Sequence, residues 1–291
     1  MAHPRGFEPL ASAFGEQLGY EVQYLPVDAQ GFVDLAILEK ELSEDVLLVS
    51  IALVNNEIGT IQDIPAISKL VRKSGALLHC DGAQAPCAIA MSAIGALVDL
   101  LSLSAHKIYG PKGIGALYVR RDLHTHIEPH IYGGGQQGNL RSGTVPVPLC
   151  VGMAEAVSLV SLTSSDCERG ELRRRTSDFM DQLHNLSWPV HLNGPEISRR
   201  HPGNANVQFD GFEAAEILQF LQPQLAASTG SACTSGIPEP SHVLRAIGLT
   251  GDQANSSIRF SIGRQTTDSD IKDAVNLIEQ ALSRCNSEIR M

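Results

Sequence analysis

Polar side chains that could hold a cofactor follow two apolar stretches of this sequence. Asp81 follows residues 77–80, and Ser104, His106 and Lys107 follow residues 100–103. Ligands of open α/β sheets bind at the carboxyl ends of the strands. A lysine there can form a Schiff base if its amine is neutral, and an aspartate can keep a pyridine nitrogen protonated. On residue types alone, a surface lysine and a helix-capping aspartate are the competing interpretations.

A candidate nucleophile lies near the C-terminus. Cys233 sits in a stretch of small and polar residues, 226–236, whereas a structural cysteine usually lies among apolar neighbours. A loop cysteine that must travel to a substrate needs such a mobile setting, and its thiolate is the reactive form. The remaining cysteines, at 80, 87, 150, 167 and 285, form no CxxC pair, so we predict neither a disulfide framework nor a metal site.

The elements that must position these residues are apolar strands alternating with helices. Apolar stretches predict strands at residues 21–25, 46–54, 76–80, 98–104 and 114–120. Residues 64–73 have the spacing of a helix that ends at Gly75. Strand, helix and strand in this order predict an α/β domain with a mostly parallel sheet and right-handed crossovers.

A smaller α+β domain is predicted to follow. A long helical pattern spans residues 146–186, and we place the boundary within it, giving domains at 1–161 and 162–291. In the second domain we expect strands at 206–209 and 257–262 and helices at 213–221, 241–247 and 268–284. Thr267 and Asp270 have the spacing of a capping box for the last helix.

Composition excludes several classes of function. The 291 residues are 43% hydrophobic and 19% charged, which is typical of a soluble globular protein. The formal charge of -10 and the lack of a basic stretch argue against a nucleic-acid partner. No apolar run approaches the roughly 18 residues of a membrane-spanning helix, and no secretory signal follows Met1. We therefore expect a cytoplasmic protein without a membrane partner.

A series of short motifs strengthens the cofactor interpretation. In order along the chain, the motifs are residues 54–59, 79–84, 104–113, 133–136, 141–144, 230–235 and 256–260. Their sequences strongly resemble those of the cysteine desulfurases, which depend on pyridoxal 5'-phosphate (PLP) and belong to the class V aminotransferases. The resemblance implies the PLP-dependent transferase fold of type I, with a large PLP-binding domain and a smaller domain that carries the cysteine loop.

The resemblance also implies a role for each matching residue. Lys107 corresponds to the Schiff-base lysine, Asp81 to the partner of the pyridine nitrogen, and Gln84 to the contact of the phenolic oxygen. The phosphate ligands are Ser104 and His106, with Thr144 reaching the phosphate in the other subunit of a homodimer. The remaining matches are His3, which stacks on the ring, Asn56 near the cofactor and substrate, Arg259, which binds the substrate carboxylate, and the catalytic Cys233.

This family converts L-cysteine to L-alanine and leaves a persulfide on the enzyme cysteine. The resemblance implies that Cys233 then passes its sulfur to an acceptor, such as an iron–sulfur scaffold protein or a tRNA-thiolation carrier. A selenocysteine lyase of the same superfamily, acting on selenocysteine, is the alternative within this class. A non-catalytic remnant or binding module is the alternative from another class.

The second alternative arises because the family has a segment upstream of His3 with no counterpart in this sequence. That segment contains a phosphate-binding loop at a helix N-terminus and two further strands of the sheet. One of these strands normally lies between residues 21–25 and 46–54, so we expect residues 21–25 to shift across, to be disordered or to pair with another chain. We also expect this chain to bind PLP weakly or not at all.

Overall fold

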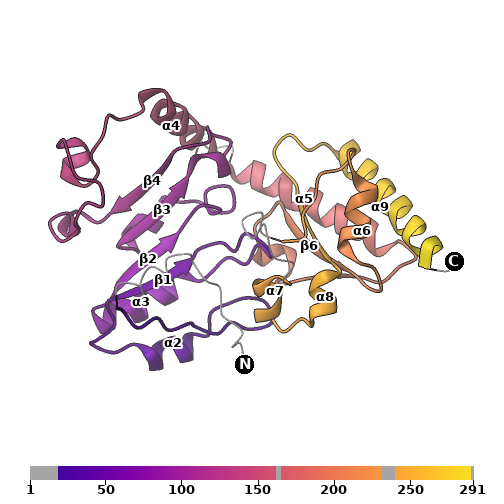
Figure 1. The fold of residues 1–291 in the computed structure, drawn as a ribbon, viewed down its shortest axis with the longest axis horizontal. Helices are drawn as coiled ribbons and strands as arrows, with labels where there is room; N and C mark the ends of the chain where they lie inside the picture. The colour runs from indigo at the N-terminus through magenta and orange to yellow at the C-terminus, as the bar shows by residue number, and fades with distance from the viewer. Residues whose placement is uncertain (1–18, 162–164, 231–239, 290–291) are drawn as a thin grey trace. The chain divides into compact units, whose positions relative to one another are not determined.

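The computed structural model describes residues 19–161, 165–230 and 240–289 (Figure 1). The described residues group into two compact units. One contains residues 38–53 and 63–165, and the other contains residues 19–37, 54–62 and the chain from 166 onward. The predicted division into domains at 1–161 and 162–291 stays a prediction.

The first unit is built on a four-stranded sheet in the order β1 (Leu48–Ala52), β2 (Leu77–Asp81), β3 (Leu100–Ser104) and β4 (Gly115–Val119). The first three strands run parallel, and β4 is antiparallel to β3. The mostly parallel sheet of the predicted α/β fold is thereby confirmed. The helices of this part are α2 (Leu35–Glu41), α3 (Ile64–Ser74) and α4 (Val147–Ser161). It also contains the short 3-10 helices η1 (Ile94–Ala96), η2 (Ala105–Lys107), η3 (Arg121–Leu123) and η4 (Gln136–Asn139).

Helix α3 covers the apolar face of this sheet and contacts β2. It begins where the Asp63 side chain accepts a hydrogen bond from the Ala66 N–H, and it ends at Gly75 in the left-handed conformation, as predicted. Ile64, Ile67 and Val71 of the helix are buried, as are Leu78 and Cys80 on β2. Because side chains alternate along a strand, His79 and Asp81 lie on the opposite face of β2.

The prediction of a strand at residues 21–25 is wrong. These residues have no strand hydrogen bonding, and Val27 makes only an isolated bridge to Val33. The expected shift to pair with β1 does not occur among the described residues, where β1 is an edge strand bonded to β2 alone. The edge leaves Leu47 and Leu48 exposed at 59% and 45%. A strand forms only where a neighbouring strand accepts its backbone hydrogen bonds, and none of the described strands does so for residues 21–25.

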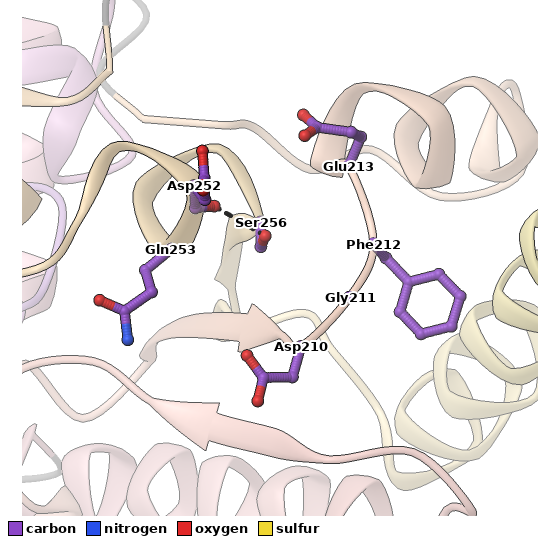
Figure 2. A pocket seen from close by; sticks show the side chains of 7 residues that line it. All are labelled: Asp210, Gly211, Phe212, Glu213, Asp252, Gln253 and Ser256. Atoms are coloured by element: carbon purple, nitrogen blue, oxygen red, sulfur yellow. Dashed lines mark hydrogen bonds between the residues drawn. The ribbon is translucent and has the colours of Figure 1, made fainter.

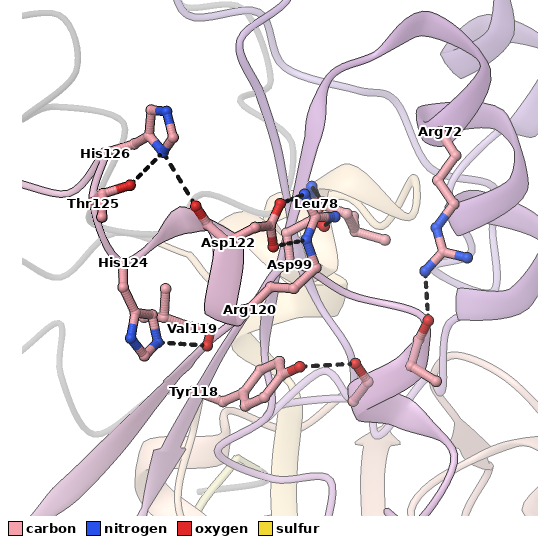
Figure 3. Close-up of polar contacts among 12 residues, drawn as sticks. Arg72, Leu78, Asp99, Tyr118, Val119, Arg120, Asp122, His124, Thr125 and His126 are labelled. Carbon is pink, nitrogen blue, oxygen red and sulfur yellow. Dashed lines mark hydrogen bonds and ion pairs between the residues drawn. The ribbon is translucent and has the colours of Figure 1, made fainter.

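Asp99 fastens the start of β3 to its neighbours (Figure 3). Its buried carboxylate accepts the Leu78 N–H at 2.7 Å through Oδ2 and binds the Arg120 guanidinium through Oδ1. Arg120 also binds the exposed Asp122. One side chain thus connects the beginning of β3 with β2 and with the residue that follows β4.

The second unit contains an antiparallel sheet in the order β5 (Val190–Leu192), β6 (Asn204–Phe209) and β7 (Ser257–Ser261). All six residues of β6 are buried, and Phe260 on β7 packs edge-on against Phe179, with 5.2 Å between ring centroids. The predicted α+β character of this region is confirmed. Its helices are α5 (Ser165–His184), α6 (Ala214–Leu221), α7 (His242–Ala246), α8 (Gly251–Asn255) and α9 (Asp268–Ile289), with the short turn η5 (Ile197–Arg199).

The capping box predicted for the last helix is present at the start of α9. Thr267 Oγ1 accepts the Asp270 N–H at 3.2 Å, and Asp270 Oδ2 accepts the Thr267 N–H at 2.7 Å. These bonds satisfy two backbone donors that no helical carbonyl can reach.

Within the described residues, no individual helix combines the length and the apolar composition needed to cross a membrane; only α4 and α5 together, as a bent pair, pass such a test.

Candidate active site

The predicted cofactor residues of the first unit lie at the carboxyl ends of adjacent parallel strands. Asp81 is the last residue of β2 and Ser104 is the last residue of β3. The chain then turns into η2, which places His106 and Lys107 directly after the strand. The structure therefore brings together the aspartate and the lysine that are 26 positions apart in the sequence.

A close approach of two backbones holds these strand ends together. The Gly82 N–H donates to the Ser102 carbonyl at 2.9 Å. A Cβ atom at residue 82 would lie 2.7 Å from the Leu101 side chain, closer than van der Waals contact allows. The same Cβ atom would lie 3.2 Å from the Ser102 carbonyl oxygen, so glycine after Asp81 lets β2 and β3 end side by side without displacing either group.

The chemistry of these side chains fits PLP. Ser104 Oγ and His106 Nδ1 are 3.0 Å apart, and both could bind a phosphate. Asp81 Oδ1 accepts the Ala83 N–H at 2.9 Å. Lys107 is exposed, and neither its amine nor Asp81 Oδ2 makes a hydrogen bond within the part of the chain that the structure describes. The Lys107 amine could react with the aldehyde of PLP, and the Asp81 carboxylate could bind its pyridine nitrogen. Ser104 and His106 could bind its phosphate.

Two further predicted cofactor residues lie in loops of the first unit. Gln84 is half-buried in the turn that follows β2. Thr144 is exposed after Gly143, in the segment that leads into α4. The role predicted for Thr144 concerns a second subunit, so a single chain does not test it.

The predicted substrate residues meet in the second unit, although 203 positions separate them. Arg259 lies in the middle of β7, opposite Asn206 of β6. Its Nη1 donates to the Asn56 carbonyl at 3.0 Å. Its backbone exchanges two hydrogen bonds with Ser228, of 2.6 Å and 3.2 Å. The guanidinium is thus held at a defined place beside the exposed Asn56 side chain.

The predicted residues His3 and Cys233 lie outside the described residues.

Sequence reasoning missed His79, which is two positions before Asp81 on the same face of β2. Its Nδ1 lies 2.8 Å from Ser50 Oγ on β1, and its Nε2 lies 2.8 Å from Ser102 Oγ on β3. Burial lowers the pKa of His79, and the charge of Asp81 opposes this effect. A polar residue inside an otherwise apolar strand, two positions before a functional residue, is the signal that could have identified it.

A shallow hollow in the second unit does not include the predicted site residues (Figure 2). It is lined by Asp210, Gly211, Phe212, Glu213, Asp252, Gln253 and Ser256. Three of these residues carry carboxylates, which would repel the carboxylate of an amino acid.

Comparison with known proteins agrees with this geometry. The model of the aminotransferase class-V family matches residues 9–273. The chain is 43% identical over 267 residues to the cysteine desulfurase IscS of Shewanella piezotolerans, covering 92% of this chain and 65% of that protein. It is 45% identical over 271 residues to the IscS of Vibrio cholerae, covering 92% and 66%. The chain thus spans about two-thirds of the length of these relatives.

The fold also matches a solved structure described as a NifS-like protein. The TM-score is 0.84 at 33% identity, and the match covers 93% of this chain and 70% of the other. The two units therefore have the fold of the type I PLP-dependent transferases. By family model, sequence and fold, this chain belongs to the aminotransferase class-V family and is similar to its cysteine desulfurases.

Proposed function

We propose that this chain carries the catalytic residues of a PLP-dependent cysteine desulfurase. The observation that supports this most directly is the placement of Asp81, Ser104, His106 and Lys107 at two adjacent strand ends. The agreement of this placement with the family's motif order adds independent support.

PLP, when bound, would supply an electron sink for the charge that develops on the substrate Cα. Lys107 would hold the cofactor and then move the Cα proton, and Asp81 would keep the proton on the pyridine nitrogen. Ser104 and His106 would bind the phosphate, with Thr144 of the other subunit of a homodimer. Gln84 would contact the phenolic oxygen, and His3 would stack on the ring.

Arg259 would bind the carboxylate of L-cysteine, because its planar fork suits a bidentate pair, and Asn56 would lie beside it. The Cys233 thiolate would then attack the substrate sulfur. A sulfur–sulfur bond forms, the substrate carbon–sulfur bond breaks, and the electron pair remains on the substrate carbon, which takes up a proton to give L-alanine. The sulfur left on Cys233 would pass to an acceptor such as an iron–sulfur scaffold protein in the cytoplasm.

Borohydride trapping tests the cofactor assignment. Excess PLP followed by reduction should attach the cofactor to Lys107, as located by peptide mass spectrometry. Lys107→Ala should abolish the adduct, whereas Lys112→Ala, a change of an exposed lysine in the next turn, should not. Equal labelling of Lys107 and Lys112 would show non-specific modification and would refute a cofactor site at Lys107.

A Cys233→Ser variant tests the sulfur step. It should leave the Lys107 adduct unchanged and abolish persulfide formation from L-cysteine. Persulfide formation at the parent rate would mean that another thiol is the acceptor.

We further propose that this chain alone has little activity, because among the described residues β1 is an edge strand bonded to β2 alone and residues 21–25 form no strand. PLP titration of the parent chain should then give a low fraction of trapped Lys107. Full occupancy, with the phosphate bound by residues of this chain alone, would contradict this expectation.

A further inference from the structure

Glu57 is a buried carboxylate that the proposed reaction does not use. Only 2% of the residue is exposed, and it directly follows Asn56. It lies in a tight turn in which Asn55 Oδ1 accepts the Glu57 and Ile58 N–H groups, both at 2.9 Å. The Asn55 N–H also donates to the Thr60 carbonyl at 2.9 Å, which closes the turn. A buried carboxylate is costly unless it is paired, so its partners indicate what it does.

The partner of the Glu57 carboxylate is Ser241. Its hydroxyl donates to Glu57 Oε2 at 2.5 Å, across 184 positions of sequence. The same Ser241 oxygen accepts the Leu244 N–H at 3.2 Å and so caps α7. Hydrogen bonds to charged groups are stronger than neutral ones, so this contact fastens the start of α7 to the turn. Ile58, which is fully buried, packs with Val243 and Leu244 of α7 and with Ile247, the residue that follows this helix, and these contacts reinforce the hydrogen bond.

The Glu57 backbone is bound to the sheet of the same unit. Its carbonyl accepts the Asn204 side chain at 3.1 Å and the Asn206 side chain at 3.3 Å. Asn206 is the β6 residue opposite Arg259. Glu57 therefore connects the turn that presents Asn56 with the strands that carry Arg259.

Glu57 also lies beside Gly230 and Ser241, two described residues on either side of the stretch 231–239. A Cβ atom at Gly230 would lie 3.5 Å from Glu57 Oε2, and the Ser241 hydroxyl donates to the same oxygen. Ser228, two residues before Gly230, pairs with the Arg259 backbone. The segment of residues 228–230 therefore contacts both the Glu57 carboxylate and the backbone of Arg259.

We propose that Glu57 is a positioning residue that fixes Asn56 and Arg259 relative to each other by fastening their turn and strand to Ser241. The inference rests on the proposed function, in which Arg259 and Asn56 receive the substrate carboxylate. Placement of binding groups contributes to catalysis because small displacements are costly.

A charge-based variant series tests the role without relying on activity. Ser241→Asp keeps a side chain that can cap α7 but places a second carboxylate against Glu57. Amide hydrogen exchange, read by mass spectrometry over residues 54–60 and 241–246, should speed up about tenfold, as expected for the loss of one charged hydrogen bond. Adding Glu57→Gln, whose amide can donate to the new aspartate, should restore protection.

The matched control is an exposed serine–carboxylate pair in the same unit. Ser198 donates to Glu196 Oε1 at 2.6 Å, so Ser198→Asp creates the same repulsion without burial. It should leave exchange at both peptides unchanged. Equal exchange in the parent chain and Ser241→Asp, or no rescue by Glu57→Gln, would overturn the positioning role.

The Arg259 side-chain Nε–H signal in NMR links the role to substrate binding. L-alanine, the proposed product, should shift this signal in the parent chain, and Glu57→Ala should weaken its apparent affinity about tenfold while Ser198→Ala should not. Unchanged affinity in Glu57→Ala would refute the positioning role. Absence of any shift in the parent chain would instead refute Arg259 as the carboxylate ligand, and hydrogen exchange would still decide the role of Glu57.

Discussion

At the scale of single residues, burial separates thiols that react from thiols that only pack. Burial, helped by the charge of Asp81, raises the pKa of Cys80 to about 12. Cys80 is fully buried on β2, the strand that contacts α3. The thiolate is the reactive form, and at neutral pH almost none of it is present at Cys80.

We therefore expect Cys80 to be alkylated by iodoacetamide only after unfolding. The exposed Cys167 provides the comparison within the same chain. Peptide mass spectrometry after a timed reaction measures both. Cys80 reacting as fast as Cys167 under native conditions would show that β2 is open to solvent.

A second residue-scale prediction concerns His201. Burial lowers the pKa of His201 from 6.5 to about 4, and its Nδ1 accepts the Gly203 N–H at 3.1 Å. Because the unfolded chain takes up a proton on this side chain at a higher pH than the folded chain, the contribution of His201 to stability is fully present above pH 6.5 and is lost as the pH drops toward 4. The loss is up to about 3 kcal/mol from this group, and the lowered pKa of His79 adds a loss of the same sign.

Urea unfolding between pH 7 and pH 4 measures this dependence. His201→Asn, whose Oδ1 can accept the same N–H, should flatten it, whereas His191→Asn, a change of an exposed residue in the same unit, should not. An unchanged slope in His201→Asn would mean that other groups cause the loss of stability.

At the scale of elements, Asp99 shows how one side chain can hold a strand in register. Removing its carboxylate in Asp99→Ala leaves the Leu78 N–H without its side-chain acceptor and Arg120 without its buried partner. We expect a loss of about 1–3 kcal/mol in the free energy of unfolding, measured by chemical denaturation.

The control is Asp122→Ala, which removes the exposed partner of the same Arg120 (Figure 3). Exposed ion pairs contribute little, so this variant should unfold like the parent chain. Similar losses in the two variants would show that the arginine contact, and not the buried N–H, determines the effect.

At the scale of the whole molecule, the role proposed for Thr144 predicts that the site is completed by a second copy of the chain. The resemblance to the family implies that Thr144 and the loop of residues 133–135 complete the phosphate site of the other subunit. We therefore predict a homodimer, which sedimentation equilibrium would reveal as a mass of about twice 31.2 kDa. A purely monomeric chain at high micromolar concentration would count against a shared site.

The sequence by itself determined the family and most of the local structure. The motifs that carry Asp81, Lys107 and Arg259 were sufficient to identify the family. Those of Asp81 and Lys107 combine a reactive residue with the glycines of a turn, and that of Arg259 places the arginine after two serines. Helix α3 and the start of α9 were predictable because their caps and apolar spacing are local, within about one helical turn.

Only the tertiary structure decided which predicted strands form and which polar groups meet. Residues 21–25 have strand-like composition, but a strand needs hydrogen bonds from a neighbour, and that requirement is not encoded locally. The contacts of His79 with Ser50 and Ser102, of Arg259 with Asn56 and of Glu57 with Ser241 join residues on different elements. Their partners depend on how the chain packs, because each hydrogen bond acts over about 3 Å in space regardless of separation along the sequence.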